Sequence, residues 1–297
     1  MTKWNANNIP DQSGRVVVIT GATSGLGKEA ARVFAQKNAT VVLAVRDLQK
    51  AEDVAKEIRH QYPQAIVESR KLDLNSLQSV HDFADDFQKS FNRLDILINN
   101  AGVMLCPFSQ TEDGFEIQIG VNHLGHFALS GLLMPLLKRT EGSRIVVTSS
   151  IAHRQGNIDF DDINWEKRPY KTGKAYGDSK MANLYFAYEL ARKSKNDATL
   201  PLVTAAHPGY TSTDLQRHSL FWRVMNPIMG QNVEHGVLPT LRAAIDPEAK
   251  AGDFYGPSGF LEMNGSPVLV KSVPLSHDEN KAKKLWKLSE ELTKIKY

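Results

Sequence analysis

Two side chains that could move a proton stand four positions apart in the segment Tyr-Gly-Asp-Ser-Lys, namely Tyr176 and Lys180. In a helix this spacing brings both side chains to one face. A phenol has a pKa of about 10, and a nearby ammonium group favours its ionised form. The pair therefore predicts a general acid/base, although the same spacing also arises in helices where both residues are structural.

Hydroxyl and amide side chains stand where apolar runs of the sequence end. Ser149 and Ser150 follow the run 145–148, and Asn100, Ala101 and Gly102 follow the run 95–99. The carboxyl ends of neighbouring parallel strands are where such folds bind ligands. Asn122 lies inside an apolar stretch, where a buried amide needs a partner. It is either part of a site or a structural amide that ties a helix to a neighbouring strand.

A glycine-rich turn, Thr20-Gly-Ala-Thr-Ser-Gly-Leu-Gly27, follows the apolar run 16–19 and leads into a helix-like stretch. A strand, a glycine turn and a helix in this order present free backbone N–H groups to a diphosphate. Gly21 allows the tight turn, Gly25 lets the backbone approach the ligand, and Gly27 lets helix and strand pack closely. The predicted contacts to a dinucleotide here are Gly21, Thr23, Ser24, Gly25, Leu26 and Gly27.

The residue after the second apolar run indicates which dinucleotide is bound. An NAD enzyme would place an acid there to bind the ribose 2′-hydroxyl, whereas this run ends in Arg46. A guanidinium group can bind a 2′-phosphate with two hydrogen bonds, so NADP is favoured. The alternative is a surface arginine paired with Asp47, which we expect to cap the following helix.

Short apolar runs alternate with amphipathic stretches along the whole chain, as in a parallel sheet with crossover helices. The predicted fold is α/β, a doubly wound Rossmann-type parallel sheet of about seven strands in a single domain spanning residues 1–297. The expected strands cover 15–20, 40–45, 66–72, 95–99, 143–149, 202–206 and 253–255. The expected helices cover 25–36, 48–61, 77–91, 112–138, 174–193, 234–245 and 278–294.

Composition excludes several classes of protein. The net charge of +3 comes from 36 basic and 33 acidic residues, which is too small to indicate a nucleic acid partner. The single Cys106 excludes an internal disulfide. His123 and His126 lack acidic partners nearby in sequence, so we expect packing residues and no metal site. No apolar run is long enough for a membrane span, and residues 1–11 are polar with no apolar leader. We expect a cytoplasmic protein.

An irregular segment, residues 211–232, follows the sixth expected strand and is rich in apolar side chains, among them Trp222 and Met225. Long irregular segments in compact domains are usually functional, so we expect a lid over the substrate. Trp165 and Tyr170 lie in a second such segment, and together these residues indicate an apolar pocket.

These motifs together resemble the short-chain dehydrogenase/reductase family, in its single-domain branch, over residues 13–265. The resemblance implies that Tyr176 is the general acid/base and that Lys180 lowers its pKa and holds the nicotinamide ribose. It implies that Ser150, rather than Ser149, hydrogen-bonds the substrate oxygen, and that Asn122 holds a water in a proton relay. The further cofactor contacts that it implies are Asp73, Leu74, Asn100, Ala101, Gly102, Pro208, Gly209, Thr211 and Thr213.

Ser150 and Tyr176 are 26 positions apart, which is more than is usual in this family. The extra segment resembles the branch that contains retinol dehydrogenases and protochlorophyllide reductase. The resemblance thus implies an NADP(H)-dependent oxidoreductase that interconverts an alcohol with an aldehyde or ketone, on a small apolar substrate. It also implies a homodimer or homotetramer, built in the family through the fourth and fifth helices. The alternative is an NADP-binding sensor or scaffold without turnover, which the presence of both Tyr176 and Lys180 disfavours.

Overall fold

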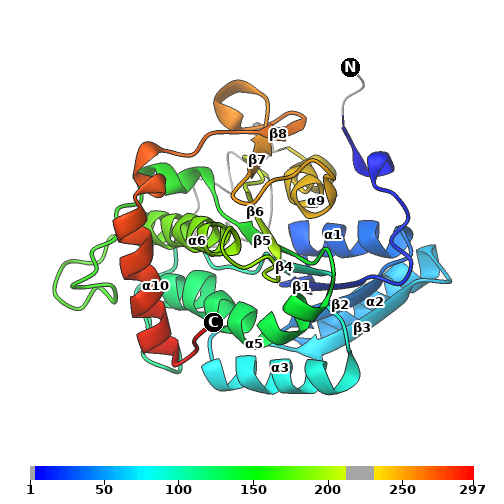
Figure 1. Cartoon of the computed structure of the whole chain (residues 1–297), viewed down its shortest axis with the longest axis horizontal. Helices are drawn as coiled ribbons and strands as arrows, with labels where there is room; N and C mark the ends of the chain where they lie inside the picture. The colour runs from blue at the N-terminus through cyan, green and yellow to red at the C-terminus, as the bar shows by residue number, and fades with distance from the viewer. Residues whose placement is uncertain (1–3, 212–230) are drawn as a thin grey trace.

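A computed structural model of the chain describes residues 4–211 and 231–297. Within this part, one sheet of eight strands has the order β3-β2-β1-β4-β5-β6-β7-β8 (Figure 1). The strands are β1 (Val16–Thr20), β2 (Thr40–Val45), β3 (Ile66–Lys71), β4 (Ile96–Asn99), β5 (Arg144–Thr148), β6 (Leu202–Ala206), β7 (Phe254–Pro257) and β8 (Pro267–Leu269). Strands β1 to β7 are parallel, and β8 pairs antiparallel to β7.

The predicted α/β fold and the single doubly wound sheet are confirmed, and the bounds of β2 and β6 agree with the prediction. The expected count of about seven strands omitted β8. That strand is a three-residue edge strand that begins with a proline, so it lacks the long apolar run by which the others are recognised. The central strand β1 is buried at every position, as a sheet covered on both faces requires.

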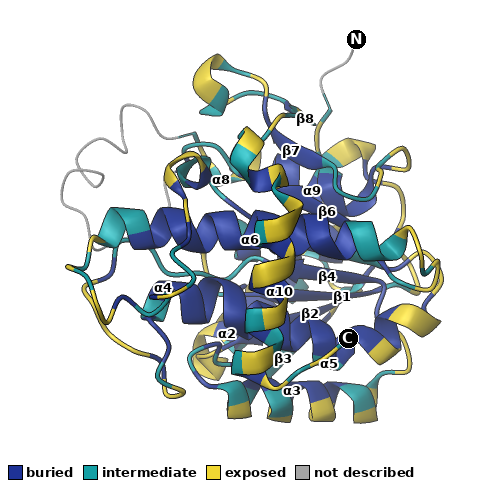
Figure 2. Cartoon of the chain, turned by 60° about the vertical axis from the view of Figure 1, so that its left-hand side comes forward, coloured by how far each residue is buried: buried dark blue, intermediate teal, exposed yellow. Residues whose placement is uncertain are grey.

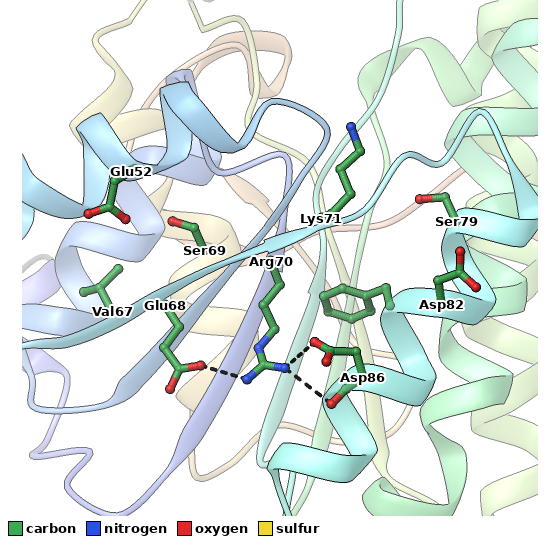
Figure 3. A pocket seen from close by; sticks show the side chains of 10 residues that line it. Glu52, Val67, Glu68, Ser69, Arg70, Lys71, Ser79, Asp82 and Asp86 are labelled. Atoms are coloured by element: carbon green, nitrogen blue, oxygen red, sulfur yellow. Dashed lines mark hydrogen bonds and ion pairs between the residues drawn. The ribbon is translucent and has the colours of Figure 1, made fainter.

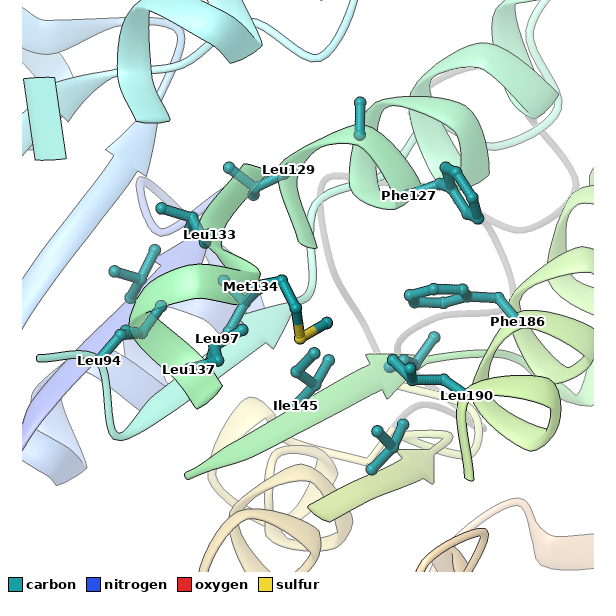
Figure 4. Packing of buried hydrophobic residues seen from close by; sticks show 14 of the residues in the cluster. Leu94, Leu97, Phe127, Leu129, Leu133, Met134, Leu137, Ile145, Phe186 and Leu190 are labelled. Carbon is teal, nitrogen blue, oxygen red and sulfur yellow. The ribbon is translucent and has the colours of Figure 1, made fainter. Parts of the chain in front are cut away.

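Two layers of helices cover the sheet (Figure 1). The helices are α1 (Gly25–Gln36), α2 (Leu48–Gln61), α3 (Leu77–Ser90), α4 (Ile117–Ile119), the π-helix η2 (Gly120–Leu124), α5 (Gly125–Arg139), α6 (Thr172–Ser194), α8 (Val233–Gly236), α9 (Leu238–Ile245) and α10 (Glu279–Thr293). Short 3-10 turns are η1 (Ala6–Asn8), η3 (Ile151–Gln155), η5 (Phe260–Glu262) and η6 (Pro274–His277). Helices α1, α2 and α9 share one core cluster with the sheet, and α3, α5 and α6 share another. Figure 4 shows part of the second cluster, where Leu97 and Ile145 of the sheet face Met134 of α5 and Phe186 of α6.

The single helix expected over residues 112–138 is wrong, because the chain forms α4, the π-helix η2 and then α5. The carboxylate of Glu116 accepts hydrogen bonds from the backbone N–H groups of Gln118 and Ile119, so the helical segment begins only after it. The π-helix contains Asn122, and such turns often occur at functional sites. The helix expected over 234–245 is likewise two helices, because Pro239 stands in the first turn of α9.

Helix α10 and the end of the chain lie across α5 and α6 (Figure 2). Trp286 and Tyr297 pack against Phe127 of α5 and Phe186 of α6. A side chain at Gly131 of α5 would come within 2.5 Å of Ile295, so the glycine permits this close approach. Helices α5 and α6, which correspond to the fourth and fifth expected helices, thus have a partner within the chain itself. Within residues 4–211 and 231–297, no helix combines the length and the apolar character that a membrane span requires.

Candidate active site

Helix α6 lies over the carboxyl end of β5 and fixes the position of Lys180. The hydroxyl of Ser149 donates to the backbone carbonyl of Lys180 (2.9 Å), and Asn183 donates its amide to the carbonyl of Thr148 (2.9 Å). The Lys180 ammonium donates to the same Thr148 carbonyl over 3.4 Å. Lys180 is buried, and burial lowers its pKa to about 8.

Tyr176 lies one turn before Lys180, with its side chain 7% exposed. Its hydroxyl group hydrogen-bonds the side chain of Ser150, so the structure brings together the two residues expected to contact the substrate oxygen. Burial raises the pKa of Tyr176 to about 12, and the bond to Ser150 opposes this rise only in part. The expected lowering by Lys180 is therefore not seen. Its ammonium lies 5.7 Å from the centre of the Tyr176 ring, and burial has the larger effect.

The amide of Asn122 is held by the loop after β4 and by α6. It accepts from the backbone N–H of Val103 (2.8 Å) and donates to the Val103 carbonyl and to the Ser179 hydroxyl, both at 2.9 Å. A side chain at Gly102 would lie 2.9 Å from the Asn122 amide oxygen and 3.6 Å from the Lys180 nitrogen. The Asn122 side chain thus ties the π-helix to the loop after β4 and to α6 rather than to a strand, and the residue also lies close to Lys180.

The glycine-rich turn has the shape that a diphosphate requires. Gly21 and Gly25 have φ angles of 68° and 53°, in the left-handed region that favours glycine. A side chain at Gly27 would come within 2.6 Å of the Asn100 amide nitrogen, so this glycine allows α1 to pack closely. Ser24 is the first residue before α1, and within the described chain its side chain does not cap the helix. The first backbone N–H groups of α1 are therefore available to bind an anion. Thr23 and Leu26 lie half-buried beside them.

Arg46 follows β2 and is exposed, with its backbone carbonyl accepting from the Lys71 ammonium (2.7 Å). Asp47 caps α2 as expected, because its carboxylate accepts from the backbone N–H of Lys50 (3.1 Å). An exposed guanidinium at this strand end can reach a ligand at the carboxyl edge of the sheet.

Asp73 and Leu74 follow β3. Asp73 accepts from the backbone N–H of Asn75 (3.0 Å) and does not cap α3, whose first residue Leu77 donates its N–H to Asp113 instead. The Asp73 side chain is therefore not a helix cap. Leu74 is buried and packs against Gly125 at the start of α5.

Thr20, the last residue of β1, is a functional candidate that the sequence analysis did not single out. Its hydroxyl accepts from the backbone N–H groups of Asn100 and Ala101, both at 2.9 Å, and the Asn100 amide donates to its carbonyl. Thr20 thereby fixes the loop after β4 against the glycine-rich turn. In the sequence, the only indication of this role is that Thr20 stands immediately before that turn.

The segment after β6 is supported by the loop 258–266. Gly209 has a φ of 66°, and its N–H donates to His207 (3.2 Å), while Tyr210 donates its N–H to the Met263 carbonyl (2.8 Å). Pro208 accepts from the hydroxyl of Thr211 (2.9 Å). Thr213 and most of the expected lid over 211–232 lie outside the described residues.

Trp165 and Tyr170 are packed within the insert that precedes α6. The guanidinium of Arg168 stacks on the Trp165 ring at 3.8 Å, and the Tyr170 hydroxyl donates to the buried carboxylate of Glu116 (2.8 Å). Asp178, within the Tyr-Gly-Asp-Ser-Lys segment, pairs with Lys174 and accepts from the backbone N–H of Asn157 (2.7 Å). These contacts anchor the insert beside the helix that carries Tyr176.

A separate hollow of about 540 Å³ lies at the β3 edge of the sheet (Figure 3). Arg70 fills its centre and pairs with Glu68 and Asp86. None of the predicted site residues lines this hollow, so it is distinct from the candidate site. Among the residues that the structure describes, no group of histidine, cysteine and acidic side chains could hold a metal ion.

Comparison with known proteins identifies the family of the chain. Residues 15–162 match the family model described as short chain dehydrogenase. Human retinol dehydrogenase 12 is 40% identical over 290 residues, covering 96% of this chain and 88% of that protein. Human retinol dehydrogenase 13 is 48% identical over 206 residues, covering 69% of this chain and 62% of that protein.

Solved structures give the same result. A protein from Mycobacterium paratuberculosis is 41% identical with a TM-score of 0.85, covering 100% of this chain and 99% of that one. A short-chain dehydrogenase from Shigella flexneri, solved with NADP, is 25% identical with a TM-score of 0.67, covering 82% of this chain and 96% of that one. The chain belongs to the short-chain dehydrogenase/reductase family and is an oxidoreductase of that family. Within the family it is similar to retinol dehydrogenases 11 to 14.

Proposed function

We propose that this protein is an NADP(H)-dependent oxidoreductase that interconverts apolar alcohols with the corresponding aldehydes or ketones. The observation that carries the proposal is the hydrogen-bonded pair of Tyr176 and Ser150 beside the buried Lys180. All three lie at the carboxyl edge of the sheet, next to the glycine-rich turn.

The residues of this chain fit the dinucleotide. Open N–H groups at the start of α1 would bind its diphosphate, and Arg46 would bind the 2′-phosphate that distinguishes NADP from NAD. Asp73 and Leu74 would contact the adenine, Asn100 to Gly102 would lie along the cofactor, and Pro208, Gly209, Thr211 and Thr213 would orient the nicotinamide. When bound, NADPH would supply the hydride.

Tyr176 would donate its proton to the carbonyl oxygen during reduction. The phenol keeps its proton at neutral pH and so can donate it, and Lys180 and the bound cofactor would have to offset the pKa that burial raises for the transfer to be efficient. Ser150 would donate a hydrogen bond to the same oxygen, while Lys180 would hold the ribose and return a proton to Tyr176. Asn122 would hold a water in the relay beyond Lys180.

The proposed substrate class is supported by the relatives and by the rim of the site. Several relatives are named for retinol, a long apolar alcohol. Val103, Met104 and Leu105 follow Gly102 directly and are only half-buried. A side chain at Gly173, in the turn before Tyr176, would lie 3.9 Å from Leu105. These residues support an apolar aldehyde such as all-trans-retinal as substrate.

The test is a turnover assay with NADPH and all-trans-retinal, with a hydrophilic aldehyde of three carbons as the comparison. We expect retinol to form with a kcat/KM well above that for the hydrophilic aldehyde. NADPH binding without oxidation of any apolar alcohol or reduction of any apolar aldehyde would support the sensor or scaffold function instead.

A further inference from the structure

His126 connects two parts of the active site that are far apart in sequence. It lies in the first turn of α5 and is 3% exposed. Its Nδ1 atom is 3.1 Å from the backbone carbonyl oxygen of Asn122, and its Nε2 atom is 2.9 Å from the hydroxyl of Thr20. From the sequence alone we expected only a packing residue at this position.

The partners of the ring determine where its proton lies. A carbonyl oxygen can only accept, so Nδ1 must carry the hydrogen and donate it to Asn122. In the neutral ring Nε2 is then an acceptor. The Thr20 hydroxyl also has the Ile98 carbonyl oxygen at 3.3 Å, but Nε2 is nearer at 2.9 Å and has no other donor within the described chain, so the hydroxyl donates to Nε2. Burial lowers the pKa of His126 to about 4, so the ring is neutral at physiological pH.

This assignment leaves the oxygen of Thr20 free to accept, and it does so twice. The backbone N–H groups of Asn100 and Ala101 both donate to it at 2.9 Å. The hydrogen bonds thus run in one direction, from the loop after β4 through Thr20 and His126 to the carbonyl of Asn122. Each donor and acceptor in this series is buried or half-buried, where a lost bond is costly.

The series joins three segments of the site. Thr20 ends β1 immediately before the glycine-rich turn, residues 100–102 form the loop beside it, and Asn122 lies in the π-helix η2. We infer that His126, as the neutral ring protonated at Nδ1, is a positioning residue that holds the cofactor loop and the π-helix in register. This inference rests on the proposed function for its kinetic consequences, but its proton position can be tested without any substrate.

The hydrogen bonds of Nδ1 and Nε2 of His126 can be removed together or one at a time. His126→Leu removes both bonds, His126→Asn keeps a donor near the place of Nδ1, and His126→Gln keeps an acceptor near the place of Nε2. His123 provides the matched control, because it is equally buried on the neighbouring turn and bonds Ser289 of α10, away from the cofactor loop. His123→Leu should lower the melting temperature but leave the kinetic constants near those of the wild type.

We expect His126→Leu to weaken NADPH binding and to lower kcat, each by about tenfold, as the loss of a buried hydrogen bond predicts. His126→Gln should recover most of the NADPH affinity, because it still binds Thr20, and His126→Asn should recover mainly kcat. The kinetic constants of His126→Leu and His123→Leu can be compared directly when both variants lower the melting temperature by the same amount. Equal kinetic losses in both variants would overturn the inference.

The proton position is measured by ¹⁵N NMR of the imidazole rings in the full chain without ligand. Signals of a neutral ring protonated at Nδ1, assigned to His126 by their loss in His126→Gln, are the expected result. A ring protonated at Nε2, or a charged ring at neutral pH, would overturn the inference. An enzyme that shows this tautomer but reduces no aldehyde would contradict the proposed function alone.

Discussion

The hydroxyl of Ser149 donates to the backbone carbonyl of Lys180 over 2.9 Å, so this serine fastens α6 to the end of β5. The hydroxyl of its neighbour Ser150 accepts from the backbone N–H of Ala152 (3.2 Å) and interacts with Tyr176 instead. Successive residues of an extended chain face opposite ways, which gives the two adjacent hydroxyl groups separate partners.

Replacing each serine with alanine should separate these roles. Ser150→Ala should lower kcat by about 100-fold, since it removes a hydrogen bond to the reacting oxygen, and should cost only about 0.5–2 kcal/mol of stability through loss of the cap of η3. Ser149→Ala should lower the free energy of unfolding by about 1–3 kcal/mol and change kcat little. Steady-state kinetics and denaturant unfolding measure both effects. A larger loss of kcat in Ser149→Ala would reverse the assignment.

Arg46 should determine the preference for NADP(H). Replacing it with alanine removes a charge-assisted bond and should weaken NADPH binding by about 1.5–3 kcal/mol, with NADH affinity nearly unchanged. Titration calorimetry with both cofactors measures the difference. If both affinities fell equally, Arg46 would have no role in choosing between them.

We expect the buried Lys180 to lower the free energy of unfolding of the protein. Burial lowers its pKa from 10.5 to about 8, so the folded state binds its proton less well than the unfolded state does. Lys180→Met should therefore raise the melting temperature of the protein without cofactor at pH 7, while abolishing turnover. The free energy of unfolding should rise by on the order of 3 kcal/mol.

The sign of this effect predicts its dependence on pH. The penalty for the buried charge is complete below about pH 8 and decreases as the pH rises toward 10.5, where the unfolded chain also loses the proton. In thermal melts, the amount by which Lys180→Met raises the melting temperature should therefore decrease over that pH range. An advantage that grows with pH would contradict the burial of a charged Lys180.

Gly27 should tolerate no side chain. The added carbon of Gly27→Ala would meet the Gly21 carbonyl and the Asn100 amide, so α1 must move away from the sheet. We expect a loss of about 1–3 kcal/mol in the free energy of unfolding and weaker NADPH binding. Gly142→Ala is a control for a glycine on the surface, since nothing lies within 4 Å of its added carbon, although its φ of 68° adds some strain. Normal NADPH affinity in Gly27→Ala would show that α1 need not pack so closely.

Regular elements could be predicted from the sequence because their apolar runs are long and their ends are marked. The bounds of α1 and α2 agree with the prediction, and Asp47 caps α2 as expected. The break of the expected helix 112–138 could not be predicted, because it depends on tertiary contacts of Glu116 with Tyr170 and Asn164. Local propensity contains no information on such partners.

The site residues also fall into two groups: those that the local sequence indicates and those whose role depends on tertiary contacts. Motif spacing indicated Tyr176 and Lys180, the family resemblance indicated Ser150, and the structure places the three together. It could not indicate Thr20 or His126, because their roles depend on which loop they face after folding. Spacing to Lys180 also says nothing of how deeply the phenol is buried, and this burial is what raises the pKa of Tyr176 in the folded chain.

The central claim is that Tyr176 is the proton donor for reduction of an apolar aldehyde. Its most direct test is Tyr176→Phe, which removes only the hydroxyl, assayed with NADPH and all-trans-retinal beside a titration of NADPH binding. We predict that NADPH binds with nearly the wild-type affinity and that kcat falls by about 1,000-fold or more. Turnover near the wild-type rate in Tyr176→Phe would contradict the claim.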